Sequence, residues 1–383
     1  MTAAPRIVWI LDQLGMGGAE RLALRFASAP HPWRIELIGL RAPAPGALAP
    51  PPGDQPVPEH ERVHAIGMRG LDDLAGWWRL VRLLQGWQPV LIHTHLRYAT
   101  VWGGTAARWL RRPYVTTVHL GPHRDTTLRQ QVIAAGERYC RRHAARVIYV
   151  SAAQKRAWGA MCAHERAVVV GNGVKLPPPA TPVRSALRRA LEIPEAATVF
   201  TTVAVVRAAK GWRTWLAAVE QIARQRPQAR FVWVGGGPEW ESLRLASARS
   251  PAYRQIVLPG TCHNVASWLH ASDVFLFPSQ EEAQPTAVME AMAAGLPVIA
   301  TDLPSIVEVL DGCGLTVPVD DAAALAGAAL VWSEPDHPAP RAAGAAARRR
   351  AESALSESFW CDQLSRLYEQ VLHEPVSSQD SAG

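Results

Sequence analysis

Short apolar runs alternate with helix-like segments along most of this chain, and that alternation limits its fold more than any other feature. Such runs are typical of buried strands. Strands separated by helices predict parallel sheets built from β-α-β units. The expected strands form a first series at 6–11, 34–40, 90–92, 114–118 and 146–150, and a second series at 199–205, 230–234, 256–258, 274–277 and 298–300.

The chain has 383 residues, which is too long for one ordinary core and suits two domains. A proline-rich segment at 176–182 lies between the two series, and we interpret it as a stiff linker. The expected domains are therefore 1–178 and 179–355, followed by an amphipathic helix at 356–373 and a disordered tail at 374–383. A second proline-rich stretch, at 41–58, is expected to be a surface loop.

The composition indicates a globular protein of the cytoplasm, with 48% hydrophobic and 19% charged residues. No apolar run approaches the length of a membrane-spanning helix, and the N-terminus enters a strand without a signal-peptide pattern. The five cysteines show neither metal-ligand spacing nor a disulfide framework, which favours a reducing compartment.

The net charge of +7 predicts an affinity for anions. Two interpretations stay open for arginine-rich helical stretches such as 138–146. They are either solvated faces, or they contact anionic lipid as a peripheral protein on the inner face of the cell membrane. Nucleic acid is disfavoured as a partner because no aromatic-plus-basic binding motif is present.

Two glutamates, Glu282 and Glu290, follow the expected strand at 274–277. Pro285 is expected as the first residue of a helix that ends near Gly295, which places Glu282 in a loop and Glu290 in the helix. Ligands of open α/β sheets bind at such strand ends, where the free amides of a helix favour diphosphate. Two carboxylates there suit either the acid and base of a hydrolase or two binding tasks on one ligand.

Two strand ends are rich in glycine, which lets the backbone approach a ligand closely. One contains Gly15, Gly17 and Gly18 just before a helix, and the other spans 235–237. The spacing in the first loop differs from the Gly-x-Gly-x-x-Gly of dinucleotide oxidoreductases, so that function is disfavoured.

Histidines and cations also gather at strand ends. His93 and His95 are expected after the strand at 90–92, and His119 after the strand at 114–118, where they can contact a ligand. They do not make up a zinc-ligand set, because carboxylate or thiolate support is lacking. Arg207 and Lys210 follow the strand at 199–205 and are either a solvated turn or a site that neutralises a diphosphate leaving group.

Taken together, these motifs resemble those of the group 1, family 4 retaining glycosyltransferases over nearly the whole chain. The most specific is the Glu282/Glu290 pair followed by Gly-Leu-Pro-Val-Ile at 295–299. The other matching segments, in order, are Gly17-Gly18-Ala19-Glu20, Thr117-Val118-His119, Asn172-Gly173-Val174 and Lys210-Gly211. The resemblance implies the GT-B fold, with two doubly wound Rossmann-like domains facing across a cleft and the helix at 356–373 crossing back to the first domain.

The resemblance also implies residue roles. Glu282 should bind hydroxyls of the transferred sugar, Glu290 the ribose, and Lys210 the diphosphate. His119 should contact the donor sugar from the first domain, and with Glu282 and Lys210 it completes the expected catalytic set. The other expected donor-binding residues are Gly17, Gly18, Arg207, Gly236, Ala283, Gln284 and Thr286, and the expected acceptor-binding residues are His95 and Tyr98.

The implied reaction moves a sugar from a UDP- or GDP-linked donor to a glycan or lipid-linked acceptor, with retention of anomeric configuration. Its expected setting is the synthesis of cell-surface polysaccharide or glycolipid. The diphosphate oxygen would accept the proton of the acceptor, so neither a metal nor another cofactor is expected. Asp72-Asp73 and Asp320-Asp321 are expected at helix starts instead.

The sequence departs from the family pattern at Val205, where an arginine usually stands five positions before Lys210. Our hypothesis is that Arg207 replaces this cation, provided that the strand continues, because residues two apart then point to the same side. Lesser departures are Ala283-Gln284-Pro285 in place of Gly-Phe-Gly, and Lys175 in place of an acidic residue.

Two alternatives remain beside the transferase. Val205 favours a catalytically weak homologue that binds nucleotide sugar as a subunit or scaffold. The sequence around the glutamate pair argues against an epimerase or phosphorylase with the same fold. That argument rests on the resemblance alone.

Overall fold

The computed structural model describes residues 4–14, 18–41, 63–70, 72–122, 126–159, 166–177, 181–194, 196–262, 264–334 and 336–374. It divides into two compact units. The first unit runs to Gly173 and resumes at Ser358, and the second spans Val174–Glu357. Of the loop expected at 41–58, Arg41 belongs to the second strand and the rest lies outside the described residues, as do the linker residues 178–180, the tail from 375 onward and Gly17.

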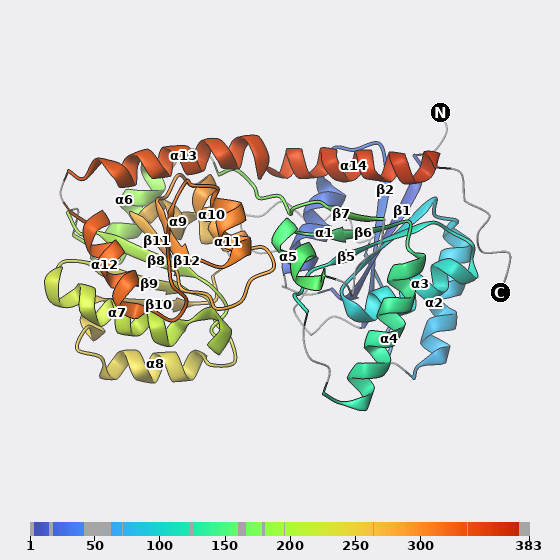
Figure 1. The fold of residues 1–383 in the computed structure, drawn as a ribbon, viewed down its shortest axis with the longest axis horizontal. Coiled ribbons are helices and arrows are strands. Elements are labelled where there is room, and N and C mark those ends of the chain that lie inside the picture. The colour runs from blue at the N-terminus through green and yellow to red at the C-terminus, as the bar shows by residue number, and fades with distance from the viewer. Residues whose placement is uncertain are drawn as a thin grey trace. The chain divides into compact units, whose positions relative to one another are not determined.

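The first unit contains a parallel sheet with the strand order β3-β2-β1-β4-β5-β6-β7 (Figure 1). The strands are β1 (Arg6–Gln13), β2 (Arg34–Arg41), β3 (Val63–Ala65), β4 (Leu91–His95), β5 (Tyr114–Val118), β6 (Arg146–Tyr149) and β7 (Ala167–Val169). The helices are α1 (Gly18–Ser28), α2 (Leu74–Trp87), α3 (Arg97–Trp109), α4 (Leu128–His143), α5 (Ala152–Trp158) and α14 (Glu357–His373).

Both faces of this sheet are buried, because successive side chains of a strand point to opposite faces. Trp9 of β1 belongs to a core that includes residues of α1 and α14. Its neighbour Ile10 belongs to a separate core with residues of α2 and α3. This explains why β1 is apolar without alternation.

The second unit repeats the same topology, with the parallel order β10-β9-β8-β11-β12-β13. The strands are β8 (Val199–Val203), β9 (Arg230–Val234), β10 (Ile256–Gly260), β11 (Val274–Phe277), β12 (Val298–Thr301) and β13 (Leu315–Val317). The helices are α6 (Thr181–Ala190), α7 (Trp212–Gln225), α8 (Trp240–Arg249), α9 (Val265–Ala271), α10 (Thr286–Ala293), α11 (Pro304–Leu310), α12 (Ala322–Trp332) and α13 (Pro338–Ala354), with 3₁₀ turns η3 (Ala208–Lys210) and η4 (Tyr253–Gln255).

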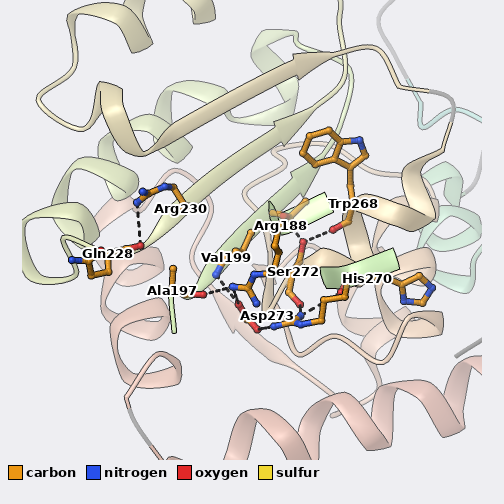
Figure 2. A network of polar contacts seen from close by, with 11 residues as sticks. Arg188, Ala197, Val199, Gln228, Arg230, Trp268, His270, Ser272 and Asp273 are labelled. Atoms are coloured by element: carbon orange, nitrogen blue, oxygen red, sulfur yellow. Dashed lines mark hydrogen bonds and ion pairs between the residues drawn. The ribbon is translucent and has the colours of Figure 1, made fainter. Parts of the chain in front are cut away.

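A polar network ties α6 to the start of β11 (Figure 2). The Asp273 carboxylate accepts hydrogen bonds from Arg184 Nη2 at 2.6 Å and from the backbone N–H of Val199 at 2.8 Å. Arg188 donates to the same carboxylate and to the carbonyl of Ala197. The network therefore fixes the helix that follows the expected linker to two neighbouring strands of the sheet.

The ten expected strands are all present, three of them with the expected bounds, at β5, β9 and β11. The short edge strands β3, β7 and β13 were not predicted. The strand expected at 199–205 ends at Val203, and His93 and His95 lie inside β4 rather than after it. Thr181 and Pro182, expected in the linker, already belong to α6.

The amphipathic helix expected at 356–373 is α14. Six residues of α14 are buried in the first unit's core with Trp9 and Phe26, namely Trp360, Cys361, Leu364, Leu367, Tyr368 and Val371. The helix therefore belongs to the first unit, although the whole second unit precedes it in the chain. No helix within the described ranges is long and apolar enough to cross a membrane.

Candidate active site

Each sheet reverses its strand order at one place, next to its first strand. In the first unit this place lies between β1 and β4, and in the second between β8 and β11. Open α/β sheets bind ligands outside the carboxyl ends of the strands at such a point. The residues that follow these strands are therefore the first candidates for a site in each unit.

In the second unit, an ion pair joins the two loops at this point. Lys210 Nζ, at the end of η3 after β8, lies 2.5 Å from Glu282 Oε1 in the loop after β11. Only 14% of the Lys210 side chain and 9% of the Glu282 side chain are exposed. The ammonium also lies 6.0 Å from the centroid of the Phe277 ring. A cation and a carboxylate are thus held together where a ligand of this fold would lie.

Glycines allow the surrounding loops to approach one another. Gly211 has φ +69°, and a Cβ there would lie 1.9 Å from the carbonyl oxygen of Pro278. Gly235 has φ +140°, and a Cβ there would lie 2.0 Å from the carbonyl oxygen of Ala204. Another residue at either place would clash with backbone, so the glycines are needed to bring the loops after β8, β9 and β11 together.

The helix after β11 begins at Thr286, with Pro285 as its N-cap residue rather than its first helical residue as expected. The helix ends at Ala293, and Gly295 follows with φ +78°, as the sequence predicts. Glu290 lies in this helix and Glu282 in the preceding loop, so the predicted placement of the pair is confirmed.

Other residues expected at the donor site also lie on these loops. Ala283 and Gln284 belong to the loop that leads into α10, and the Gln284 carbonyl accepts a hydrogen bond from the N–H of Thr286 at 3.1 Å. Gly236 follows β9, and its carbonyl accepts a hydrogen bond from the N–H of Val206 at 2.8 Å. The roles of these residues in binding stay predictions.

The strand on which the Arg207 hypothesis depends ends earlier than expected. Because β8 ends at Val203, Val205 and Arg207 do not alternate on a continuous strand. Between them Val206 is buried, while Val205 and Arg207 are both exposed. Arg207 is the N-cap residue of η3, and its backbone carbonyl accepts a hydrogen bond from the N–H of Lys210 at 2.9 Å. Its guanidinium has no ion pair with any residue that the structure describes.

One carboxylate near this site was not predicted. Glu239 accepts hydrogen bonds from the N–H of Ala208 at 2.5 Å and from the Trp212 indole at 3.0 Å, and Arg213 pairs with it at 3.1 Å. These contacts, with the indole contributing most, lower the pKa of Glu239. The signal in the sequence is its position two residues after the glycine-rich segment 235–237. Glu239 holds the turn that carries Lys210.

In the first unit, the site at the switch point is built from aromatic rings. His95 Nδ1 and His119 Nε2 lie 3.0 Å apart, and the His95 ring stacks on Trp9 with centroids 4.3 Å apart. His93 is hydrogen-bonded on both sides, to the Tyr368 hydroxyl at 2.6 Å and to Thr117 Oγ1 at 2.7 Å. The three predicted histidines are therefore brought together.

These histidines are neutral bases. Removal from solvent lowers the pKa of His119 to about 4 and lowers the pKa values of His93 and His95 well below their usual range. His95 Nε2 is buried without a hydrogen-bond partner among the described residues. The residues that line a small hollow around it include Trp9, Thr117, His119, Asn172 and Trp360.

Sequence inspection also missed buried charges beside His119. Glu137 accepts a hydrogen bond from Arg97 Nε at 3.1 Å and pairs with Arg141, whose guanidinium stacks on Trp158 at 4.2 Å from the ring centroid. His119 lines a second hollow with these side chains. The predicted acceptor residue Tyr98 lies nearby in sequence on α3, under the Arg41 guanidinium at 4.7 Å.

Asp12, in β1, is a further unpredicted residue of this edge. Its carboxylate accepts a hydrogen bond from the N–H of Ala99 at 2.7 Å, in the first turn of α3. Burial is the main cause that raises the pKa of Asp12, to about 7. Gly18, expected in donor binding, is the first residue of α1 at the same end of β1.

Metal ligands were not expected, and within the described ranges no group of three or more His, Cys, Asp or Glu side chains is arranged to hold a metal ion. The aspartates assigned to helix starts are found there. Asp73 caps α2 by accepting from the N–H of Gly76, and Asp321 caps α12 by accepting from the N–H of Ala324.

Each of the two units contains a segment that matches a known protein family. Residues 16–176 match Glycosyltransferase Family 4, and residues 197–333 match Glycosyl transferases group 1. A 2-deoxystreptamine N-acetyl-D-glucosaminyltransferase of Streptomyces fradiae is 28% identical over 85% of this chain and 80% of its own length. A phosphatidyl-myo-inositol mannosyltransferase of Mycobacterium tuberculosis is 34% identical over 42% of this chain and 44% of its own length.

Among solved structures, Anabaena HepE in complex with UDP-glucose aligns with a TM-score of 0.80 and 20% identity, over 95% of this chain and 99% of that one. This similarity confirms the predicted GT-B fold of two Rossmann-like domains. Together, the fold, the placement of Glu282 and Glu290, and the matches to both halves of the sequence show that this chain belongs to the group 1, family 4 glycosyltransferases.

Proposed function

We propose that this protein is a retaining glycosyltransferase that moves a sugar from a nucleotide-diphosphate sugar to a glycan or lipid-linked acceptor. The donor is UDP- or GDP-linked, and the product belongs to a cell-surface polysaccharide or glycolipid. The observation that carries the proposal is the buried Lys210–Glu282 pair at the strand-order switch of the second unit. Its ammonium group suits the diphosphate of a nucleotide sugar, and its carboxylate can accept hydrogen bonds from sugar hydroxyls.

The proposed chemistry follows from the two groups of this pair. The Lys210 ammonium stabilises the negative charge that develops on the diphosphate as the bond to the sugar breaks. Glu282 accepts hydrogen bonds from hydroxyls of the transferred sugar, which fixes the position of the anomeric carbon. Glu290 takes the ribose hydroxyls. Because the two side chains contact each other, both groups are already held at one place before a ligand binds.

The acceptor is assigned to the first unit, at His95 and Tyr98, and His119 of the same unit is assigned to the donor sugar. A lowered pKa keeps His119 neutral at pH 7, so its ring can exchange hydrogen bonds with hydroxyls without adding a charge. The acceptor attacks the face from which the diphosphate leaves. A diphosphate oxygen takes the proton of the attacking hydroxyl, which retains the anomeric configuration and needs no metal ion.

The relatives support this assignment by their names. HepE was solved with UDP-glucose, and the aligned enzymes of Streptomyces and Mycobacterium transfer N-acetylglucosamine and mannose. These names favour a nucleotide sugar over other nucleotide ligands. They do not identify the sugar for this chain.

Thermal denaturation with UDP, GDP, ADP and CMP, and with the sugars linked to each, tests the donor assignment. A ligand that binds the native state raises Tm by mass action, and we expect the shift with UDP or GDP and their sugars. If none of the eight classes of ligand shifts Tm at saturating concentration, the donor site is wrongly assigned.

Turnover then separates an enzyme from a binding homologue. With the donor that binds, addition of acceptor should release nucleoside diphosphate in the presence of EDTA, and proton NMR should show retained configuration at the anomeric carbon. Donor binding with no release for any acceptor would favour the catalytically weak homologue that Val205 suggests.

A further inference from the structure

Three tryptophans of α2 and α3 form a cluster in which two of the rings are exposed. The ring centroids of Trp78 and Trp109 lie 5.5 Å apart, and Trp77 lies 5.0 Å from Trp78 and 6.0 Å from Trp109. Trp77 is anchored by an indole hydrogen bond to Thr105 Oγ1 at 3.1 Å. By contrast, 44% of Trp78 and 62% of Trp109 are exposed, so these rings contribute little to the core of the unit.

The neighbouring helix α4 extends this apolar surface. Leu128, Val132 and Tyr139 are all exposed and recur at helical spacing on one side of the helix. Tyr139 lies under the Arg108 guanidinium at 5.4 Å, and Arg108 directly precedes Trp109. Helix α3 packs against both α2 and α4, as Figure 1 shows. The exposed apolar side chains therefore share a surface formed by α2, α3 and α4, which we call the α2–α4 face.

The charge of these elements is strongly positive. Helices α2, α3 and α4 and the turn 110–113 contain ten arginines and one acidic residue, Glu137. Glu137 is buried and pairs with Arg97 and Arg141. Asp73 at the start of α2 lies 3.6 Å from Arg79. Four of the arginines on these helices and the turn are exposed, namely Arg82, Arg111, Arg129 and Arg138.

We propose that the α2–α4 face docks on an anionic lipid bilayer. Exposed tryptophan and tyrosine with arginine is the combination that suits the lipid–water interface, where the rings enter the headgroup region and the guanidinium groups contact anionic lipid. The residues project from three helices, so they form a broad surface rather than a groove for one peptide. Nucleic acid would use the cations but would leave Leu128 and Val132 exposed to water.

The face is separate from the proposed sugar site, because it is carried by the sides of helices rather than by strand ends. Trp78 lies in the interior of α2, and Leu128 and Val132 lie on the surface of α4. The catalytic assignment and the membrane assignment can therefore fail independently.

Sedimentation with vesicles tests the proposal on the full chain. At low salt the protein should sediment with vesicles of phosphatidylcholine that contain about one third phosphatidylglycerol, and much less with phosphatidylcholine alone. Each arginine near such a surface strengthens binding by about fivefold. The double variant Arg111→Glu/Arg138→Glu should therefore bind at least about 25-fold more weakly, and Trp78→Ser/Trp109→Ser should also reduce binding.

The second unit offers a matched control. Tyr253 is 51% exposed, and the adjacent Arg254 donates to its hydroxyl at 2.7 Å. The variant Tyr253→Ser/Arg254→Glu removes one exposed aromatic side chain and reverses one charge, away from the α2–α4 face. It should keep nearly all vesicle binding. All variants alter exposed side chains, so their Tm should stay within about 2 °C of the original.

Three results would overturn the proposal. They are failure of the unaltered protein to sediment with the anionic vesicles, undiminished binding by both α2–α4 variants, and an equal loss in the Tyr253/Arg254 control. The Tm shift with nucleotide, measured in solution without lipid, should be the same in every variant. That measurement keeps a failure of the membrane proposal apart from a failure of the donor assignment.

Discussion

The two units share one strand order but present opposite chemistry at the point where that order reverses. In the second unit, a lysine and a glutamate form an ion pair between two glycine-dependent loops. In the first, neutral histidine rings stack and hydrogen-bond among themselves. Topology therefore fixes where each site lies, and the side chains at the strand ends decide what each can bind.

The difference has an electrostatic cause. Lys210 and Glu282 are largely buried as an ion pair, in which each charge compensates the other. The histidines have no carboxylate partner among the contacts that the structure describes, so burial keeps them uncharged. The second unit is thus suited to a ligand with a diphosphate, and the first to hydroxyl groups.

Removal of the charge from the second unit should have the largest effect. For Lys210→Ala we expect kcat to fall by about 10²–10³, because a developing negative charge loses a preorganised cation. Release of nucleoside diphosphate at saturating donor measures it. The control Arg224→Ala removes an exposed cation from α7 of the same unit and should leave kcat unchanged.

Arg207→Ala, measured in the same assay, decides whether that residue replaces the cation missing at Val205. A fall in kcat comparable with that of Lys210→Ala supports the replacement. If kcat falls in the lysine variant alone, Arg207 has no part in the reaction.

The glycine dependence of the loops is tested by Gly211→Ala, which should lower the free energy of unfolding by at least about 2 kcal/mol. Its φ of +69° is strained for any side chain, and the new Cβ would meet the Pro278 carbonyl at 1.9 Å. Gly327→Ala is the matched change in the same unit, since Gly327 is exposed in α12 with open space around it. That variant should gain about 1 kcal/mol. Equal denaturant midpoints for the two variants would contradict the steric argument.

The neutral histidines should make the first unit sensitive to acid. The folded state holds the pKa of His119 at about 4, below the 6.5 of an unfolded chain, so the unfolded state binds more protons between these values. The free energy of unfolding should therefore decrease as pH falls from about 6.5 towards 4. The measurement is the Tm of the unaltered protein and of His119→Gln over this pH range. The Tm of the variant should decrease less as the pH falls. Parallel curves would show that His119 does not contribute.

The smallest expected effect concerns the contact between β4 and α14. Tyr368→Phe removes the hydroxyl that lies 2.6 Å from His93 Nδ1 and should lower the free energy of unfolding by about 1–3 kcal/mol, at the lower end if water replaces it. Urea denaturation measures it. No change would mean that the buried histidine satisfies this nitrogen in another way.

The sequence was most informative where a strand is buried on both faces. The bounds of β5, β9 and β11 agree with prediction because each is a short, largely buried segment that is followed directly by His119, Gly235 or Pro278. By contrast, β3, β7 and β13 are three-residue edge strands with partly exposed side chains, which show no pattern that distinguishes them from loops. Their formation depends on pairing with a neighbouring strand.

Residues of the candidate site were predicted from the sequence, but the contacts between them were not. Both Lys210 and Glu282 were assigned to the donor, yet nothing in their separation of 72 positions indicates that they pair with each other. His93 and His95 were placed after β4 because polar side chains usually end a buried strand. They remain inside it because side chains from other segments form hydrogen bonds with their rings, including Tyr368, which is 275 positions from His93. Hydrogen bonds to residues so distant in the chain cannot be inferred from the local sequence pattern.

The position of α14 has a consequence for synthesis of the protein. The second unit is continuous in the chain from Val174 to Glu357, whereas the first unit's core lacks Trp360 and Tyr368 until residues beyond that unit have been made. On the ribosome, the unit that is translated first is therefore completed last. Until α14 arrives, the face of the sheet that bears Trp9 is only partly covered, and this is the interval in which the nascent chain most needs protection from aggregation.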